Sequence, residues 1–403
     1  MTDLRRHLRV ALLICAGGLA PAAAATAEHR YRLSVDPQLR WVTVRAELDA
    51  RNAPPAGVSL AARDGDAAQL RDLAGCDGGN VQIDGDRIRA TGCVRYRHEL
   101  TSAAEGDWRA PRTAQDERVT APGQWLWLPQ LGAADRVSVT LDLPPGVRAA
   151  VPWSPLAEDR YELRPSPRSS RAVAVFGNFR WQNLELPGTL LRVALVDSPR
   201  QSLDAAAVGE WLVAAARDVT RVSGAFPNPA PQVIVQPSPI AWSSASRSAV
   251  PFGYVIRDGG ESVRFFVDAQ RPVADLLGDW TATHEFSHLL LPYVRSADKW
   301  VSEGFASYYQ NVLLARRGVY TERQTWRRLS QAFAQAAATP DPPALRDVGS
   351  RPFWEVRMLI YWSGAAIALL ADVELRERSE GRESLDTVLA RLQDCCLPSG
   401  RVW

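Results

Sequence analysis

Apolar and polar residues alternate along the first half of the chain. The alternation is regular over residues 42–48 and again over residues 137–143, and this is the period of a strand with one buried face. Residues 81–89 read as a hairpin with an Asp-Gly pair at its turn. Because Pro and Gly interrupt the pattern at short intervals, we predict a β-sandwich-like domain over residues 28–190.

The pattern changes near residue 191, where short apolar runs begin to alternate with longer helical ones. The expected strands are residues 191–196, 232–235 and 263–267. The expected helices are residues 202–222, 273–291, 302–314, 321–339, 361–376 and 384–392. The helix at 361–376 is strongly apolar, but we expect it to be too short, and too charged at its end, to span a bilayer.

This alternation predicts an α+β, multidomain fold. An α/β domain at residues 191–320 would follow the β-rich domain, and a short helical part would occupy residues 321–403. A chain of 403 residues is long enough for two or three domains.

The helix predicted at residues 273–291 carries an H-E-x-x-H motif at residues 284–288. Residues four apart lie on one helix face, so His284 and His288 can ligate one metal ion. Glu285 can lean toward the open side of that ion, where a water would sit. Glu303 follows His288 after 14 intervening residues and supplies a third ligand. Three ligands and one open position indicate a catalytic zinc rather than a structural one.

The competing interpretation is that the two histidines form an ordinary polar patch. The chain has five His, however, and two of them fall within this pentapeptide. The motif is specific enough that we favour a site for one Zn²⁺, on the condition that residues 284–288 are helical.

The N-terminal residues 1–27 read as a secretory signal peptide. Arg5, Arg6 and Arg9 precede an apolar run, and small residues at 25–27 form a cleavage site. We therefore expect an exported protein, periplasmic or secreted, without a transmembrane anchor after cleavage. The signal carries the whole formal net charge of +2, so the mature chain is near neutral, which argues against a nucleic-acid partner.

Four cysteines lie beyond the signal, and export makes disulfides plausible. Cys76 and Cys93 flank the predicted hairpin and can pair across it. Cys395 and Cys396 are adjacent, and because a bridge between neighbours is strained, their state is left open.

Four tryptophans of the β-rich part lie in or beside its predicted loops: Trp108, Trp125, Trp127 and Trp153. They could line a ligand cleft, but we favour packing at a domain interface.

Two further segments give the motif a family resemblance. The motif and the string Ser302–Tyr308 resemble the gluzincin metallopeptidases of the glycyl aminopeptidase and aminopeptidase N type, whose second ligand helix carries a similar E-G-F-x-S-Y string. The run Tyr361–Gly364 resembles the Y-x-K-G element of these families, with Ser363 in place of the usual Lys. The resemblance covers roughly residues 273–392 and is faint over the β-rich part.

The resemblance implies a thermolysin-like zinc-peptidase fold for residues 191–320. It implies that His284, His288 and Glu303 bind zinc, that Glu285 is the general base and acid, and that Tyr361 stabilises the transition state. The chain ends without the PDZ-like domain of the glycyl branch, so we expect either a shortened member or a truncated sequence.

One element of these families has no counterpart. The amine-binding string G-x-M-E-N, or G-G-L-E-H in the other branch, is missing, and the nearest candidate is Gly259–Ser262. Glu261 could bind a substrate amine there, although a loop Glu beside two Gly is more often a solvated turn residue.

These observations predict a zinc-dependent metallopeptidase that hydrolyses peptide bonds of peptides or proteins, with an aminopeptidase favoured. An endopeptidase of the same fold and a non-catalytic, zinc-containing, peptide-binding relic are the alternatives. The oligomeric state is left open.

Overall fold

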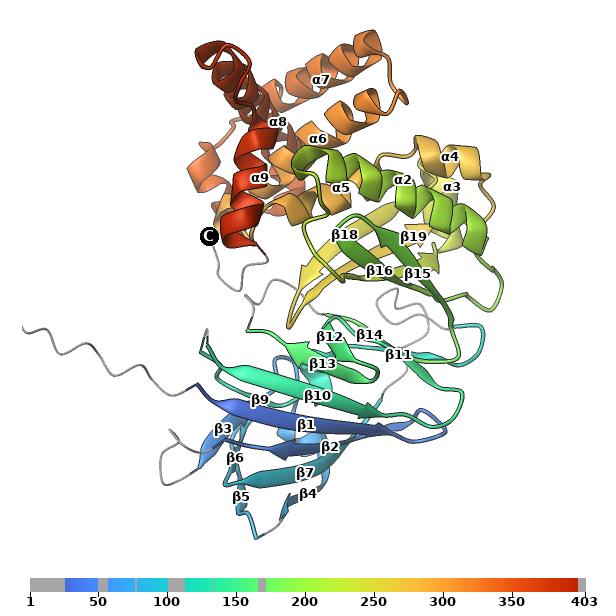
Figure 1. Ribbon diagram of the computed structural model, residues 1–403, viewed down its shortest axis with the longest axis vertical. Coiled ribbons are helices and arrows are strands. Elements are labelled where there is room, and N and C mark those ends of the chain that lie inside the picture. Colours follow the sequence, from blue (N-terminus) through green and yellow to red (C-terminus); the bar gives the residue numbers. More distant parts are fainter. Residues whose placement is uncertain are drawn as a thin grey trace, which may run out of the picture.

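The computed structural model describes residues 26–49, 57–76, 78–100, 113–132, 134–165 and 172–397. Its β-rich part, its five-stranded sheet and its helices are stacked along the long axis of the molecule (Figure 1). Nearly all of the predicted signal peptide and Trp108 lie outside the described residues.

Two sheets form the predicted β-sandwich. The larger has the order β12-β13-β10-β1-β2-β7-β4 and the smaller the order β5-β6-β3-β9. Their strands are β1 (Glu28–Val35), β2 (Trp41–Glu47), β3 (Val58–Ala61), β4 (Arg71–Cys76), β5 (Val81–Asp84), β6 (Arg87–Ala90), β7 (Cys93–Glu99), β9 (Leu128–Pro129), β10 (Arg136–Asp142), β12 (Ser154–Ala157) and β13 (Arg160–Leu163).

Alternate residues of these strands meet in one core between the two sheets. Leu33 of β1 lies opposite Val44 of β2 and Leu141 of β10, and all three share a buried cluster with Leu60 and Ile88 of the smaller sheet. The alternation seen in the sequence therefore marks the buried faces correctly.

The cysteines form two disulfides. Cys76 ends β4 and pairs with Cys93, which opens the neighbouring strand β7, a pairing that the sequence allows. Cys395 and Cys396 are also joined, at the end of α9 (Leu385–Cys396).

The described tryptophans of the β-rich part are packing residues, as favoured, but they do not all lie at an interface. Trp125 and Trp127 are fully buried inside the sandwich core. Trp153 lies at the boundary with the next sheet, where Arg192 donates to its carbonyl oxygen at 3.0 Å.

A three-stranded sheet joins the sandwich to the five-stranded sheet. It contains β8 (Arg118–Thr120), β11 (Arg148–Ala150) and β14 (Ala174–Gly177). Val119 and Val175 of this small sheet share a buried cluster with Ala194, Ile234 and Ile256 of the five-stranded sheet. One face of the five-stranded sheet is therefore covered by the β-rich part.

The five-stranded sheet has the order β15-β16-β17-β19-β18. Its strands are β15 (Arg180–Leu186), β16 (Thr189–Leu195), β17 (Gln232–Pro237), β18 (Phe252–Arg257) and β19 (Glu261–Val267). The three central strands are parallel, and the two edge strands run antiparallel to their neighbours. The strand β15 lies before residue 191, where the sequence pattern changes, and pairs with β16 in this sheet.

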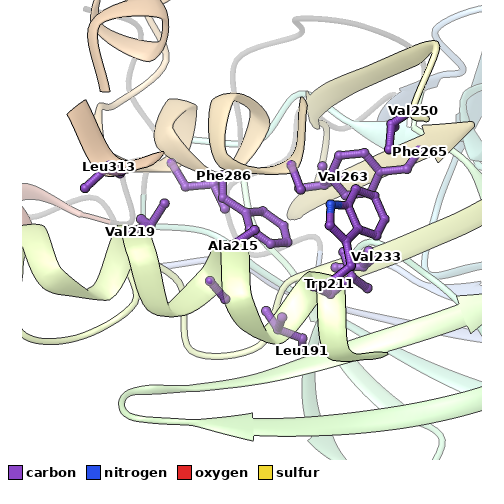
Figure 2. Packing of buried hydrophobic residues seen from close by; sticks show 14 of the residues in the cluster. Leu191, Trp211, Ala215, Val219, Val233, Val250, Val263, Phe265, Phe286 and Leu313 are labelled. Carbon is purple, nitrogen blue, oxygen red and sulfur yellow. The ribbon is translucent and has the colours of Figure 1, made fainter. Parts of the chain in front are cut away.

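Helices cover the other face of the five-stranded sheet. The helix α2 (Ala205–Ser223) begins at Asp204, whose side chain accepts from two backbone N–H groups, and ends at Gly224, where φ is 84°. Figure 2 shows Trp211 of this helix against Phe265 of β19, with Phe286 to one side of them. The rings of Phe265 and Phe286 lie 5.8 Å apart, so the motif helix is fixed to the sheet through Phe286.

The helix predicted at residues 273–291 is broken into three pieces. They are α4 (Val273–Gly278), α5 (Thr281–Ser287) and a 3₁₀ turn at His288–Leu290. The break falls at Asp279, whose buried carboxylate accepts from the Thr281 N–H at 2.8 Å and also bonds to Ser248. Such local bonds compete with a continuous helix.

Four longer helices complete the fold: α6 (Lys299–Arg316), α7 (Glu322–Ala337), α8 (Phe353–Arg378) and α9. The short helices α1 (Pro122–Trp125) and α3 (Ile240–Ala245) lie in connections. Ala365 and Ala368 of α8 and Leu389 of α9 belong to the same core cluster as α2. The predicted C-terminal part is therefore packed onto α2 and the five-stranded sheet as one structure.

Helix α8 begins eight residues before its predicted start and has 26 residues. The expectation that it is too short for a bilayer is therefore wrong: by length and composition alone it could cross a membrane. The apolar core helix of a soluble protein meets the same condition, and Ala365 and Ala368 are fully buried against other helices.

Candidate active site

The structure brings together the three residues predicted to bind metal. His284 comes from α5, His288 from the turn that continues it, and Glu303 from the second turn of α6. All three are buried, and their ligand atoms lie within 4.8 Å of one another. The Nε2 atoms of the two histidines are 3.4 and 3.5 Å from the same Glu303 oxygen.

These distances fit a metal ion better than direct hydrogen bonds. Glu303 Oε2 is buried and has no hydrogen-bond partner among the described residues, and N–H···O bonds centre near ~2.9 Å. Two ligands at about 2.1 Å from a tetrahedral zinc ion lie roughly 3.4 Å apart. Although burial opposes it, the neighbouring imidazoles hold the pKa of Glu303 well below its ordinary value, so Glu303 is a carboxylate, the form that ligates metal.

Two residues not predicted from the sequence orient the histidines. His284 Nδ1 lies 2.7 Å from Gln310 Oε1, and His288 Nδ1 lies 2.9 Å from Ser302 Oγ. An amide oxygen only accepts, so Nδ1 of His284 carries the proton and Nε2 keeps its lone pair for the metal. Gln310 follows Glu303 by seven residues, two helical turns on the same face, and this spacing is the signal that could have identified it.

Glu285 occupies the position expected of the general base. It is buried and lines the same cavity as His288 and Glu303. Burial raises the pKa of Glu285 above its ordinary value. The edge strand β18 passes close by, because a Cβ at Gly253 would lie 3.0 Å from Glu285 Cγ. A glycine at residue 253 therefore leaves room for the base.

Tyr361 reaches the site from α8. Its ring stacks on His284 with centroids 5.8 Å apart and planes 5° from parallel. Burial raises the pKa of Tyr361 far above its ordinary value, and the carboxylates of Glu303 and Glu285 add to the effect. The phenol therefore keeps its proton and can donate a hydrogen bond into the cavity.

A close helix crossing sets the position of Tyr361. A Cβ placed on Gly304 of α6 would lie 2.3 Å from the backbone carbon of Gly364 in α8. The two backbones can approach this closely only because both residues are glycine. Glu303 precedes one glycine and Tyr361 lies one turn before the other, so the crossing brings both to the same site.

The site opens into a cavity of about 350 Å³, a volume suited to a small ligand or part of a peptide. One wall is the edge strand β18, and the opposite wall comes from the segment before α6 and from the start of α8. Aromatic residues of the lining are Phe252, Tyr254, Tyr293, Phe353 and Tyr361.

Glu261 lies elsewhere. It opens strand β19 instead of standing in a loop, and its carboxylate accepts from Arg257 Nε at 3.0 Å and from Asn228. It is not among the residues that line the cavity. Arg257 Nη2 in turn donates to the carbonyl oxygens of His288 and Leu291, each at 2.9 Å. In this structure Glu261 supports the turn that carries a metal ligand, and its role in binding a substrate amine stays a prediction.

The fold and the site are those of the zinc metallopeptidase class, and the His-His-Glu cluster of this chain can bind one zinc ion. The resemblance to the gluzincins is confirmed, because residues 290–344 match the model of the M61 glycyl aminopeptidase family. That segment contains Glu303 and the string that follows it. No curated protein matches the chain.

Solved structures share the fold over nearly the whole chain. An aminopeptidase N family protein from Idiomarina loihiensis has a TM-score of 0.61 at 13% identity, over 91% of this chain and 70% of that one. An M1 zinc metallopeptidase from Deinococcus radiodurans, bound to a Tyr-Ser-Ala substrate, has a TM-score of 0.53 at 12% identity, over 94% and 88%. Yeast LTA4 hydrolase with bestatin has a TM-score of 0.51 at 10% identity, over 92% and 61%. The likeness therefore includes the β-rich part, where the sequence resemblance is faint.

Proposed function

We propose that this protein is an exported zinc aminopeptidase that removes residues from the amino ends of peptides or proteins. The observation that carries the proposal is the buried cluster of His284, His288 and Glu303 beside Glu285 and Tyr361 at one cavity. The match to a glycyl aminopeptidase family supports action at the amino end.

The chemistry follows from the positions of the side chains. Zinc bound by the cluster would lower the pKa of its water to near ~7 and polarise the scissile carbonyl. Glu285 accepts a proton from the attacking water and returns it to the leaving amine. Tyr361 donates a hydrogen bond to the carbonyl oxygen as negative charge develops there.

Replacement of the general base tests this mechanism. We expect Glu285→Gln to lower kcat by about 10²-fold or more, because general-base catalysis contributes on that scale. The protein should still bind one equivalent of zinc, since Glu285 is not a ligand. Metal analysis and hydrolysis rates are measured on the same preparations, with the surface substitution Glu322→Gln as control. Unchanged hydrolysis by Glu285→Gln would exclude the mechanism.

An endopeptidase is the second candidate, and one feature of the cavity favours it. Among the described residues that line the cavity, the carboxylates are Glu285 and Glu303, and both belong to the reaction site. An aminopeptidase is expected to pair the substrate ammonium with a carboxylate. A panel of amino-acid amides and internally quenched peptides separates the two: an aminopeptidase cleaves the amides, and an endopeptidase cleaves the quenched peptides. Hydrolysis of neither by the zinc-loaded protein would support the peptide-binding relic.

Export to the periplasm or outside the cell is part of the proposal. The signal-like residues 1–27 and the two disulfides support it, because disulfides persist in oxidising compartments. The thermolysin-like assignment of the catalytic domain is proposed as well, supported by α5 and α6 standing on one face of a mixed sheet. The near-neutral mature chain supports peptide partners rather than nucleic acid.

A further inference from the structure

The chain contains a single lysine among its 47 basic residues, and this lysine lies in the active-site cavity. Lys299 is the first residue of α6, four residues before the ligand Glu303. Its side chain is 45% exposed, so its ammonium group is open to the cavity and to solvent.

The contacts of Lys299 position its ammonium group but do not use all of its hydrogen-bond donors. Nζ lies 3.8 Å from Glu303 Oε1, which is too long for a strong hydrogen bond. It lies 4.4 Å from the centre of the Phe353 ring, a cation–π contact at the cavity wall. An ammonium group has three donors, and these two contacts leave donors for another acceptor in the cavity.

The charges around the cavity favour a negative ligand at this point. The described basic residues that line it are Arg257 and Lys299. Arg257 is engaged by Glu261 and by two backbone carbonyl oxygens. The two lining carboxylates lie at the metal position, where a zinc ion would offset their charge. A substrate carboxylate near Lys299 is therefore attracted, and a substrate ammonium group is repelled.

We propose that Lys299 is a specificity-determining residue that binds a carboxylate of the peptide substrate close to the scissile bond. The inference deepens the proposed peptidase function and rests on it. The carboxylate can be an Asp or Glu side chain or the free C-terminus of a short peptide, since both present the same group. Lysine suits this place because its compact charge on a flexible stem can follow either source.

The test measures binding separately from hydrolysis. Calorimetry measures the binding of peptides to zinc-loaded Glu285→Gln protein. Ala-Glu-Ala-amide and Ala-Gln-Ala with a free C-terminus are each compared with the neutral Ala-Gln-Ala-amide. Glu-Ala-Ala-amide is compared with Gln-Ala-Ala-amide. We expect at least one acidic peptide to bind about tenfold more tightly than its neutral partner, the scale of one hydrogen bond to a charged group. The preferred peptide identifies the source of the carboxylate.

Substitution of Lys299 in the Glu285→Gln protein tests whether this lysine causes the preference for acidic peptides. Lys299→Met should abolish the difference in affinity between the acidic peptide and its neutral partner, while zinc content stays at one equivalent. Lys299→Arg should keep most of that difference. Lys299→Gln repeats the experiment if methionine disturbs folding. The control is Arg295→Met, which removes an exposed cation that pairs with Asp298 and does not line the cavity.

Two results would overturn the assignment: equal binding of acidic and neutral peptides, or a Lys299→Met protein that loses zinc or weakens both peptides equally. In the second case Lys299 interacts with Glu303 and does not bind the substrate. Hydrolysis by the wild-type protein separates this inference from the proposed function. If acidic peptides bind more tightly through Lys299 but the wild type hydrolyses nothing, the Lys299 site is supported and the peptidase function is contradicted. If the wild type hydrolyses peptides but shows no preference for acidic ones, the peptidase function is supported and the Lys299 site is contradicted.

Discussion

Each predicted metal-binding histidine uses its second ring nitrogen to hold a polar side chain. His284 contacts Gln310 and His288 contacts Ser302, and both partners lie on the helix that also carries Glu303. One helix therefore supplies a ligand and orients the other two. Such outer contacts commonly change metal affinity by about 10–100-fold when they are lost.

At the same scale, the phenol of Tyr361 should act on the transition state rather than on substrate binding. We expect Tyr361→Phe to lower kcat by about 10²-fold, or roughly 3 kcal/mol, the usual loss for one oxyanion donor. KM and zinc content should change little, because the ring and its stacking on His284 remain. Steady-state kinetics and metal analysis measure these quantities.

The matched control for this substitution is Tyr293→Phe, which removes a phenol oxygen from the same cavity. Its kinetics should stay close to those of the wild type. A rise in KM with unchanged kcat in Tyr361→Phe would assign the residue to substrate binding instead.

At the scale of elements, the site depends on how α6 and α8 meet. Gly304 and Gly364 let the two backbones touch. Tyr308, one turn after Gly304, donates to Asp372, two turns after Gly364, at 2.8 Å. The same carboxylate accepts from Arg376 and from the Leu385 N–H at the start of α9. These contacts fix the angle at which Tyr361 enters the site.

We expect Gly304→Ala to destabilise the protein by about 1–3 kcal/mol, the usual cost of overpacking. The added methyl would lie 2.3 Å from a backbone carbon, so the helices must separate. This cost exceeds the gain of up to ~1 kcal/mol that Ala brings to a helix. The free energy of unfolding in urea measures the change.

Gly209→Ala is the matched control, because Gly209 also lies inside a helix and its nearest contact would be an ordinary 3.4 Å. That substitution should be neutral or stabilising. Equal effects of the two substitutions would show that the α6–α8 crossing tolerates a larger residue.

The Asp372 contacts predict a pH dependence of stability. Burial alone would raise the pKa of Asp372, but donation from the Leu385 N–H, Arg376 and Tyr308 lowers it below its ordinary 3.8. The carboxylate therefore contributes its full stability above pH 3.8 and loses it as pH falls through the lower, folded pKa.

We expect Asp372→Asn to cost about 2 kcal/mol at pH 7, the scale of hydrogen bonds to a charged group. The difference from the wild type should shrink on acidification below 3.8, the ordinary pKa of this carboxyl group. Urea unfolding of both proteins across this range measures it. If the difference stays constant with pH, the ionised Asp372 stabilises the fold no more than the protonated form does.

At the scale of the whole molecule, the β-rich part supports the edge of the five-stranded sheet. The turn between β18 and β19 rests on the sandwich, where a Cβ at Gly260 would lie 1.9 Å from the Pro152 carbonyl oxygen. The Arg164 N–H also donates to the Gly259 carbonyl oxygen at 3.0 Å. The pair of glycines that resembles an exopeptidase element in sequence is thus a contact between the two parts.

We expect Gly260→Ala to loosen this contact and to cost about 1–3 kcal/mol of unfolding free energy. Calorimetry should show a lower Tm, and Gly278→Ala, where an added methyl meets nothing within 4 Å, should not. Arg257 and Glu261 flank this turn and pair with each other, and Arg257 donates to the His288 carbonyl oxygen, so zinc affinity should also fall. A Tm equal to that of the control would exclude a structural role for this contact.

Most of the local structure was predictable from the sequence. The alternation of strands such as β2 and β10, the end of α2 at Gly224 and the H-E-x-x-H spacing depend on neighbours within a few residues of one another. The identities of His284, His288 and Glu303 follow from a motif for the same reason. The starts of α6 and α8 and the break at Asp279 were missed, because they depend on contacts with distant segments.

By itself, then, the sequence determined which residues can bind a metal and which strands and helices form, since spacing and periodicity are local properties. Only the tertiary structure decided that Gln310 and Ser302 orient the ligands, that Glu261 pairs with Arg257, and that Lys299 opens into the cavity. The physical reason is that hydrogen bonds, close backbone contacts and cavity walls join side chains far apart in the chain, and no local pattern records which of them meet.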